Sequence, residues 1–273
     1  MKLLTAFSII AILILAVSVS KAQEFNLYGS RAHALAGASV SLADSWSVFG
    51  NQAGLATTHR LTIGGTFQSR FLIKELSSAS GFFLLPVQSS VFAFSVYQFG
   101  KTTFRHEKFG LTFARSLNPR LHVGLQFNYY RFFMAEENQT IGTFGAELGF
   151  QYQLTNRLML GFHSLNPYKI SIKTFSGEYA YPSRYNIGAH YLLSESFGIV
   201  TEIEKDLSQP LFIKTGLEYA IGNKFFIRTG ISGKPYQLSA GMGFAVSGLK
   251  IDMAVAYNQY LGNSPSVSFQ YQF

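Results

Sequence analysis

The side chains able to do chemistry in this chain are few and widely spaced. Six histidines are present and cysteine is absent, and no histidines stand at the HExxH spacing of a zinc hydrolase. His163 and Ser164 place a base beside a hydroxyl, but no acid stands at a motif spacing from them. The many glycines form no phosphate-binding loop between a strand and a helix. We therefore expect no catalytic residue, no metal and no cofactor, and a protein that is not an enzyme.

A second group of polar side chains carries charge and lies toward the C-terminus, on one face of predicted strands: Glu202, Glu204, Lys214, Glu218, Arg228, Lys250 and Asp252. Symmetric hairpins around 205–210 and 222–223 would set Glu202 opposite Lys214 and Glu218 opposite Arg228. Opposite residues of a hairpin have Cβ atoms about 4.5–5.5 Å apart, so these charges can pair. Two roles stay open: an ion-pair ladder that fills and stiffens an interior, or a polar lining that guides a substrate.

The elements that position these charges are short strands. Apolar and polar residues alternate with period two over 121–129, 144–152, 185–193, 238–246 and 249–257, which is the pattern of a strand with two unlike faces. The alternation is less clear over 77–86 and 89–99. Six tight turns alternate with seven looser connections and give about fourteen strands. Alternating turn lengths and an even strand number are typical of outer-membrane barrels, whereas a soluble β-sandwich remains the alternative.

Composition supports the membrane alternative. Only 13% of the residues are charged, against about 25% in soluble domains. Residues 1–22 have the basic start, apolar run and small residues of a signal peptide; an N-terminal anchor helix is the alternative, because the apolar run 3–19 is near the lower limit for a span. The last strand alternates and ends in Phe273, which resembles the sorting signal of outer-membrane barrels. We expect an exported protein of the bacterial outer membrane.

The formal net charge is +8, and removal of Lys2 and Lys21 with the signal peptide would leave +6. We place seven basic residues in long, outward connections: Lys74, Lys101, Arg105, Lys108, Lys169, Lys173 and Lys234. Cations there suit outer-membrane lipid and lipopolysaccharide, which are the expected lipid partners. No basic cluster on a soluble face suggests nucleic-acid binding.

Residues 29–56 differ in composition from the rest of the chain, because they are rich in Gly, Ala and Ser. A barrel of about fourteen strands encloses a lumen that side chains alone do not fill. We therefore assign 23–58 to a plug segment inside a barrel formed by 59–273. The candidate plug residues are Arg31, His33, Asp44, Trp46, Phe49 and Asn51, and Asp44 is placed to cap a short helix.

The motifs of the plug segment carry a family resemblance. Gly29-Ser30-Arg31-Ala32, Ala36-Gly37-Ala38, Leu42-Ala43-Asp44 and Asn51-Gln52-Ala53-Gly54-Leu55 resemble the N-terminal region of FadL-like and PorV/PorQ-like barrels, with Gln52 where that pattern usually has Pro. Tyr181-Pro182-Ser183-Arg184 resembles the middle of PorV/PorQ-like chains. The resemblance implies an all-β, transmembrane antiparallel barrel of 14 strands with an N-terminal luminal plug.

The same resemblance implies two functions. One is passive transport of small hydrophobic molecules across the outer membrane. The other is a non-transporting accessory barrel that docks a type IX secretion or surface-protein complex. The longest outward connection, 164–183, carries Tyr168, Phe175, Tyr179 and Tyr181, and it could serve as a funnel for a hydrophobic ligand or as a docking surface for a protein complex.

Overall fold

The computed structural model describes residues 29–135, 139–168, 170–174, 177–222, 224–233 and 236–273. The predicted signal peptide, 1–22, and the first part of the predicted plug segment, 23–28, lie outside the described residues.

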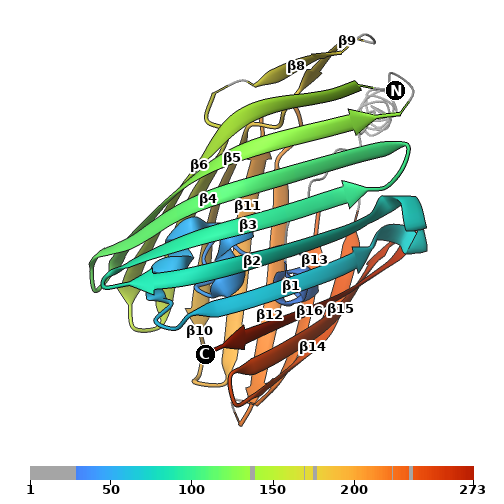
Figure 1. Ribbon diagram of the computed structural model, residues 1–273. Coiled ribbons are helices and arrows are strands. Elements are labelled where there is room, and N and C mark those ends of the chain that lie inside the picture. The colour runs from blue at the N-terminus through green and yellow to red at the C-terminus, as the bar shows by residue number, and fades with distance from the viewer. Residues whose placement is uncertain (1–28, 136–138, 169, 175–176, 223, 234–235) are drawn as a thin grey trace, which may run out of the picture.

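Fourteen strands close into one antiparallel barrel, in which each strand pairs with the next barrel strand along the chain, β7 with β10 included, and β1 closes on β16 (Figure 1). The barrel strands are β1 (Thr62–Ser69), β2 (Ser77–Val87), β3 (Ser90–Gly100), β4 (Phe104–Asn118), β5 (Leu121–Met134), β6 (Gln139–Thr155), β7 (Leu158–Leu165), β10 (Arg184–Leu192), β11 (Phe197–Asp206), β12 (Phe212–Ile221), β13 (Phe225–Ser232), β14 (Gln237–Val246), β15 (Leu249–Asn258) and β16 (Gly262–Gln272). The predicted all-β barrel of about 14 strands is confirmed.

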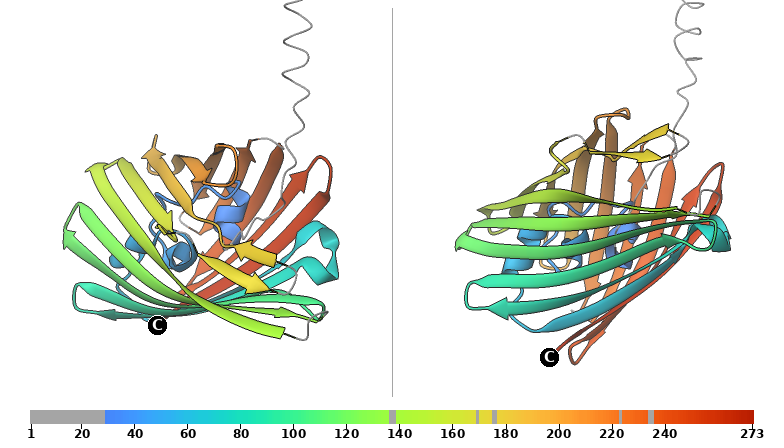
Figure 2. Two further views of the ribbon diagram at one scale, coloured as in Figure 1. Left: turned by 90° about the horizontal axis from the view of Figure 1, so that it is seen from above. Right: turned by 45° about the horizontal axis from the view of Figure 1, so that its top comes forward.

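The connections are short at one end of the barrel and longer at the other. Two short 3-10 helices, η3 (Arg70–Leu72) and η4 (Lys74–Leu76), join β1 to β2 at the long-connection end. The predicted loop 164–183 contains two strands that the sequence pattern did not indicate, β8 (Ser171–Thr174) and β9 (Gly177–Ala180). These strands form a separate two-stranded sheet beside the barrel rim (Figures 1 and 2).

The outward face of the barrel is covered by large apolar side chains. Leu111, Phe127, Phe144, Ile227 and Met242 are all more than half exposed. A soluble protein rarely exposes contiguous apolar surface on this scale, whereas the lipid-facing band of a membrane barrel requires it. The outward face therefore argues against the soluble β-sandwich.

Among the described residues, the helices are all too short or too polar to cross a membrane.

The lumen is crossed by residues 29–58, which lie inside the ring of strands when the barrel is viewed along its axis (Figure 2). This segment contains α2 (Ser30–Ala34) and two 3-10 helices, η1 (Ser45–Phe49) and η2 (Gln52–Thr57). Helix α2 contacts β13 to β16, and η2 contacts β3 to β6. Asp44 caps η1 as expected, because its carboxylate accepts the N–H of Trp46 at 2.9 Å.

Strands β2 and β3 have apolar side chains on both faces, which explains why their alternation is unclear in the sequence. Their outward face carries exposed residues such as Phe83 and Phe94, while inward Phe82 and Tyr97 are buried. Phe82 packs edge-on against Trp46 of η1, with ring centroids 4.9 Å apart. Inward side chains on this side of the barrel therefore contact protein instead of water.

Candidate functional site

The wall of the lumen carries a belt of inward glycines where residues 29–58 pass closest to it. One such glycine stands on each of β5, β6, β7, β10, β12, β13 and β14: Gly124, Gly149, Gly161, Gly188, Gly216, Gly230 and Gly241. A Cβ added at any of them would lie 2.1–2.7 Å from an atom of the segment. Real Cβ atoms do not approach so closely, so larger residues at these positions would push the segment away from the wall.

This glycine belt was not predicted, because the sequence pattern indicated only glycines of strands and turns. The signal was present in the sequence as a small inward residue on successive predicted strands. On β11 the corresponding residue is Val200, which is fully buried and packs in a small core with Leu35, Ala38 and Leu42 of the segment.

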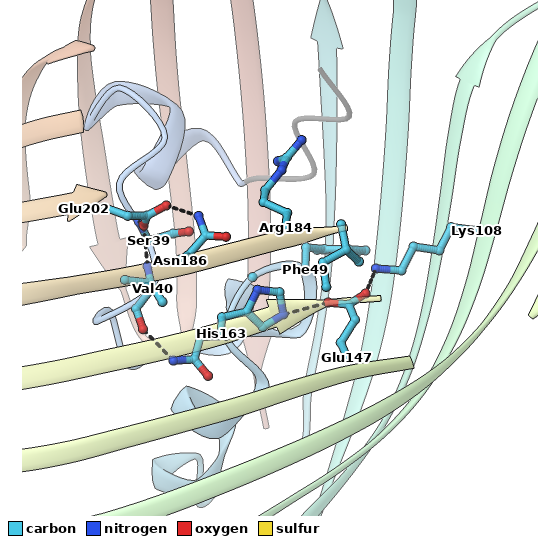
Figure 3. Close-up of a pocket in the computed structure, with 12 residues that line it drawn as sticks. Ser39, Val40, Phe49, Lys108, Glu147, His163, Arg184, Asn186 and Glu202 are labelled. Carbon is cyan, nitrogen blue, oxygen red and sulfur yellow. Dashed lines mark hydrogen bonds and ion pairs between the residues drawn. The ribbon is translucent and has the colours of Figure 1, made fainter. Parts of the chain in front are cut away.

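Hydrogen bonds also attach the middle of the segment to the wall. Oε2 of Glu202 accepts the backbone N–H groups of Ser39 and Val40 at 2.7 and 2.8 Å (Figure 3). The carbonyl of Val40 accepts the side-chain amides of Asn51 and Gln151 at 2.7 and 3.1 Å. Buried backbone groups that lack a helix or sheet ladder need such partners, so Glu202 has a structural contact with the segment in addition to its ion pair.

Glu147 on β6 is a buried carboxylate that the sequence did not single out. It accepts hydrogen bonds from Lys108, from Gln52 Nε2 at 2.8 Å and from Asn128 Nδ2 at 2.8 Å. His163 Nε2 lies 3.0 Å from Glu147 Oε2 (Figure 3). The histidine thus contacts a carboxylate of the neighbouring strand within a structural network.

Lys108 corrects the expectation that it lies in an outer connection. Its side chain is only 2% exposed and forms an ion pair with Glu147 inside the barrel. The reason is the length of β4, which runs from Phe104 to Asn118 and extends further than the ten-residue strand expected. Lys108 therefore falls on an inward position of the strand.

The first group of predicted luminal charges lies on β11 and β12. The register sets Glu202 opposite Lys214, as hairpin symmetry predicts, and Lys214 Nζ lies 3.0 Å from Glu202 and 2.7 Å from Glu204. Arg184 adds a further contact, with Nε 3.4 Å from Glu204. This contact of Arg184 was not predicted, although Arg184 ends the Tyr181-Pro182-Ser183-Arg184 motif.

The second group joins the wall to α2. Glu218 stands opposite Arg228, again as hairpin symmetry predicts, and accepts a two-pronged contact from Arg31 at 2.9 and 2.7 Å. Arg31 also donates to Asp44 at 2.8 Å, and Arg228 donates to Asp252 at 2.7 Å. Burial lowers the pKa of Arg31, but the two carboxylates outweigh burial and raise that pKa above its ordinary value. Arg31 therefore stays charged.

Lys250 departs from the expected ladder. Arg228 already pairs with Asp252, the inward neighbour of Lys250 on β15. The ammonium of Lys250 instead lies 4.9 Å from the centroid of the Phe226 ring, a cation–π geometry. The charges consequently form two separate groups bound to different parts of the segment.

The four aromatic residues expected in the outer connection have different surroundings. Tyr168 is exposed, whereas Tyr181 is buried and its hydroxyl bonds His106 on β4. Phe175 lies outside the described residues, and Tyr179 is described only by its backbone in β9. Tyr181 therefore belongs to the lumen.

Among the cavities of the described part of the chain, a small one and a larger one adjoin the segment. The small one of about 30 Å³ lies between residues 39–40, 49–51 and the polar wall that includes Glu147, Arg184 and Glu202 (Figure 3); this is room for one or two water molecules. The larger one of about 660 Å³ opens at the short-turn end. We call it the vestibule; it is lined by Arg31, Asp44, Ser45, Thr57, Lys250 and their neighbours. The described residues contain no cluster of side chains able to hold a metal ion.

No family model and no curated protein matches the sequence. Solved structures do match. The toluene transporter TodX of P. putida superposes with a TM-score of 0.71 at 12% identity, covering 92% of this chain and 99% of the other. The Ralstonia pickettii toluene transporter TbuX gives 0.70 at 12% identity, with 92% and 100% coverage. A Pseudomonas aeruginosa FadL homologue gives 0.68 at 13% identity, with 90% and 98% coverage.

The chain shares its fold with these three proteins. The likeness agrees with the FadL-like half of the expected resemblance and gives no support to the PorV/PorQ-like half. At this level of identity it establishes the 14-strand architecture, and the residues of the lumen must carry any argument about function.

Proposed function

We propose that this chain is an outer-membrane channel for the passive transport of small hydrophobic molecules. The observation that carries the proposal is the 14-strand barrel of FadL-type fold whose lumen is filled by a packed segment and paired charges. A general porin needs an open, water-filled lumen for polar solutes. Two of the neighbours in fold are toluene transporters, so a monoaromatic hydrocarbon is the first substrate to test.

Within this proposal, residues 29–58 act as the plug. The glycine belt brings the segment into contact with seven strands, and Glu202, Glu218 and Glu147 bind it through hydrogen bonds. Contacts from so many strands would exclude ions and polar solutes from the lumen when no substrate is passing. The plug contains the six candidate residues of the sequence analysis: Arg31, His33, Asp44, Trp46, Phe49 and Asn51.

The proposed location is the bacterial outer membrane, with the long connections outside the cell. The apolar outward face suits the hydrocarbon of a bilayer. Lys74 and Lys101 lie in the long connections and are exposed, where they would meet the phosphates of lipopolysaccharide. Export by a signal peptide at 1–22 remains a prediction.

Uptake of labelled toluene by whole cells tests the proposal. The protein is produced in a strain that lacks channels of this fold, and the initial uptake rate is measured at low toluene concentration. An unrelated outer-membrane barrel, produced in equal folded amount, serves as the control. The proposal predicts a rate several-fold above the control. Equal rates in cells with the same amount of folded protein would contradict it.

A second candidate is the accessory barrel that docks a secretion or surface-protein complex. The observation that favours it is the β8–β9 sheet, which is separate from the barrel ladder, together with exposed Tyr168 nearby. Affinity purification from detergent-solubilised membranes of the native cell separates the two candidates. Stoichiometric recovery of a larger membrane complex, with loss of that complex when 167–182 is shortened, would favour the accessory role.

A further inference from the structure

We infer that the short-turn end of this barrel binds an anionic phospholipid through three arginines, Arg115, Arg120 and Arg157, here called the arginine triad. The site lies on the outside of the barrel wall and takes no part in transport through the lumen. It rests on the membrane location given under the proposed function. Three features support it: the charge of the short-turn end, the orientation of Arg115 and the level of the triad in the membrane.

The short-turn end of the barrel is strongly basic. In the described part of the chain, its turns and the adjoining strand ends expose five Lys or Arg side chains against one acid: Arg60, Arg115, Arg120, Arg157 and Lys224, against Glu195. The ion pairs found between described residues include none of these six side chains. Such an excess of positive charge attracts an anionic surface.

The three arginines of the triad lie on two adjacent hairpins. Arg115 is near the end of β4, Arg120 is in the β4–β5 turn, and Arg157 is in the β6–β7 turn. The two turns are in contact, because the N–H of Gln153 donates to the carbonyl of Arg120 at 2.8 Å. Strands β4 to β7 are consecutive in the sheet, so at about 4.8 Å per strand the triad spans roughly 14 Å.

Arg115 points away from the lumen, on the lipid face of β4. Its neighbour Ala114 is buried and faces inward, whereas Phe113 and Leu117, on the same face as Arg115, are exposed. Arg115 is itself exposed and lies three residues before the end of β4. Long basic side chains near the end of a membrane span extend toward the headgroups. A lipid can therefore reach Arg115, whereas the surrounding hydrocarbon keeps a soluble partner away from it.

Other outward basic side chains have a partner within the protein. At the long-connection end, Arg105 and Arg131 share the carboxylate of Glu107, and Lys205 Nζ donates to a backbone carbonyl at 2.6 Å. Arg115 has no ion pair and no side-chain hydrogen bond with any described residue. A lipid phosphate can take the place of that partner, because the guanidinium fork matches two phosphate oxygens.

A girdle of tyrosines marks the edge of the hydrocarbon at the short-turn end. Four outward tyrosines lie within three residues of that end of their strands and are 40–48% exposed: Tyr152, Tyr191, Tyr219 and Tyr271. Such girdles lie at the membrane interface. Leu121 stands opposite Tyr152 in the sheet, and Arg120 is the next residue toward the turn. Arg120 therefore lies just beyond the girdle, at the level of the headgroup phosphates, and so does the neighbouring turn with Arg157.

The charge of the triad favours a lipid that carries no cation of its own. Phosphatidylcholine has an ammonium group that three guanidinium groups repel, whereas phosphatidylglycerol has only its phosphate. Short turns of outer-membrane barrels face the periplasm, so the triad would meet the phospholipid of the inner leaflet. An anionic phospholipid is therefore the ligand that the charge and the level of the site select.

Spin-labelled phospholipids test the site. The purified protein is reconstituted in phosphatidylcholine vesicles, and electron paramagnetic resonance gives the fraction of labelled phosphatidylglycerol or labelled phosphatidylcholine that the protein immobilises. The triad variant carries Arg115→Gln, Arg120→Gln and Arg157→Gln. The matched control loses three exposed cations at the long-connection end, through Lys74→Gln, Lys101→Gln and Lys205→Gln.

Wild type should prefer phosphatidylglycerol about threefold or more, since each basic side chain near an anionic surface adds to the attraction. The triad variant should lose this preference, and the control should keep most of it. Equal loss in both variants would overturn the inference, because the preference would then follow from the overall charge. Absence of a preference in wild type would also overturn it. Stronger displacement of the label by lipid A than by unlabelled phosphatidylglycerol would assign the site to outer-leaflet lipid and contradict the inference.

Single variants decide the matter if the triad variant does not fold. Arg115→Gln should lower the preference at least twofold, and Arg115→Lys should retain part of it, because the charge remains on the lipid face. An unchanged preference in Arg115→Gln would contradict the site. Toluene uptake does not enter this measurement. A lipid preference without toluene uptake would therefore overturn the proposed function alone, and toluene uptake without a lipid preference would overturn this inference alone.

Discussion

Nε2 of Gln52 donates a hydrogen bond of 2.8 Å to Oε2 of Glu147. Gln52 stands where the FadL-like pattern usually has proline, and proline has no side chain able to make this contact. Both residues are almost fully buried. Gln52, which looks like a local departure from the pattern in the sequence, therefore links residues 29–58 directly to Glu147 on the barrel wall.

Replacing Gln52 with leucine should weaken the docking of the plug. The change keeps the volume similar but removes one donor to a buried carboxylate, which costs about 1.5–3 kcal/mol for a charged acceptor. Trp46 is the only tryptophan, so its fluorescence reports the unfolding of residues 29–58. In the leucine variant, the red shift of Trp46 emission should occur at a lower urea concentration than in wild type. Gln52→Pro is the matched variant, since proline fits the first position of η2; it should behave like leucine. Unchanged midpoints for both would show that the hydrogen bond is dispensable.

Replacing Glu147 with leucine should destabilise the barrel more strongly. The change leaves Lys108 buried without its carboxylate, and such a loss costs about 3–5 kcal/mol. The double variant Lys108→Met with Glu147→Leu removes both charges and should recover much of the stability. The free energy of unfolding in detergent micelles, measured by urea titration, gives the comparison. A double variant as unstable as the single one would contradict a dominant Lys108–Glu147 pair.

Much of the barrel could be predicted from the sequence, because most strands have an apolar outward face and a polar or small inward face. Strand register followed from hairpin symmetry, which correctly paired Glu202 with Lys214 and Glu218 with Arg228. Strands β2 and β3 were the weakest part of the prediction. Their inward face contacts Trp46 and Phe49, so the alternation on which the prediction depended is absent there.

The polar network around Glu147 could not be predicted, because it joins side chains of several strands, and β5 lies between β4 and β6 in the sheet. Glu147, Lys108 and His163 lie on β6, β4 and β7, and the long strand β4 moved Lys108 from an expected loop into the lumen. The glycine belt was visible only as single residues. Its contact with residues 29–58 depends on where that segment passes through the lumen, and no local sequence pattern determines that path.

Enlarging a belt glycine should open the barrel to ions. A Cβ on Gly161 would lie 2.1 Å from the carbonyl oxygen of Val40, whereas a Cβ on Gly81 would meet only ordinary contacts at 3.5 Å or more. Gly161→Ala should therefore displace the plug and raise single-channel conductance in planar bilayers, and Gly81→Ala should not. Equal conductance in the two variants would mean that the close approach at the belt does not position the plug.

The docking of the plug should weaken in acid through His33. Burial, and then the charge of Arg70, lower the pKa of His33 from 6.5 to about 4, and its Nδ1 lies 2.8 Å from Ser266 Oγ. An undocked His33 binds a proton more readily than the docked one, so its contribution to docking is complete above pH 6.5 and falls as the pH drops toward 4. Trp46 fluorescence should show this loss, and His33→Asn should reduce it. An identical pH profile in that variant would assign the effect to other groups.

We propose that this barrel passes apolar molecules while residues 29–58 exclude polar ones. The most direct test is the ratio of two initial uptake rates in the same cells, one for toluene and one for glycerol, with and without the protein. We expect the protein to raise toluene uptake several-fold and to leave glycerol uptake unchanged. Equal increases for both solutes would indicate an open porin, and no increase for toluene would contradict transport.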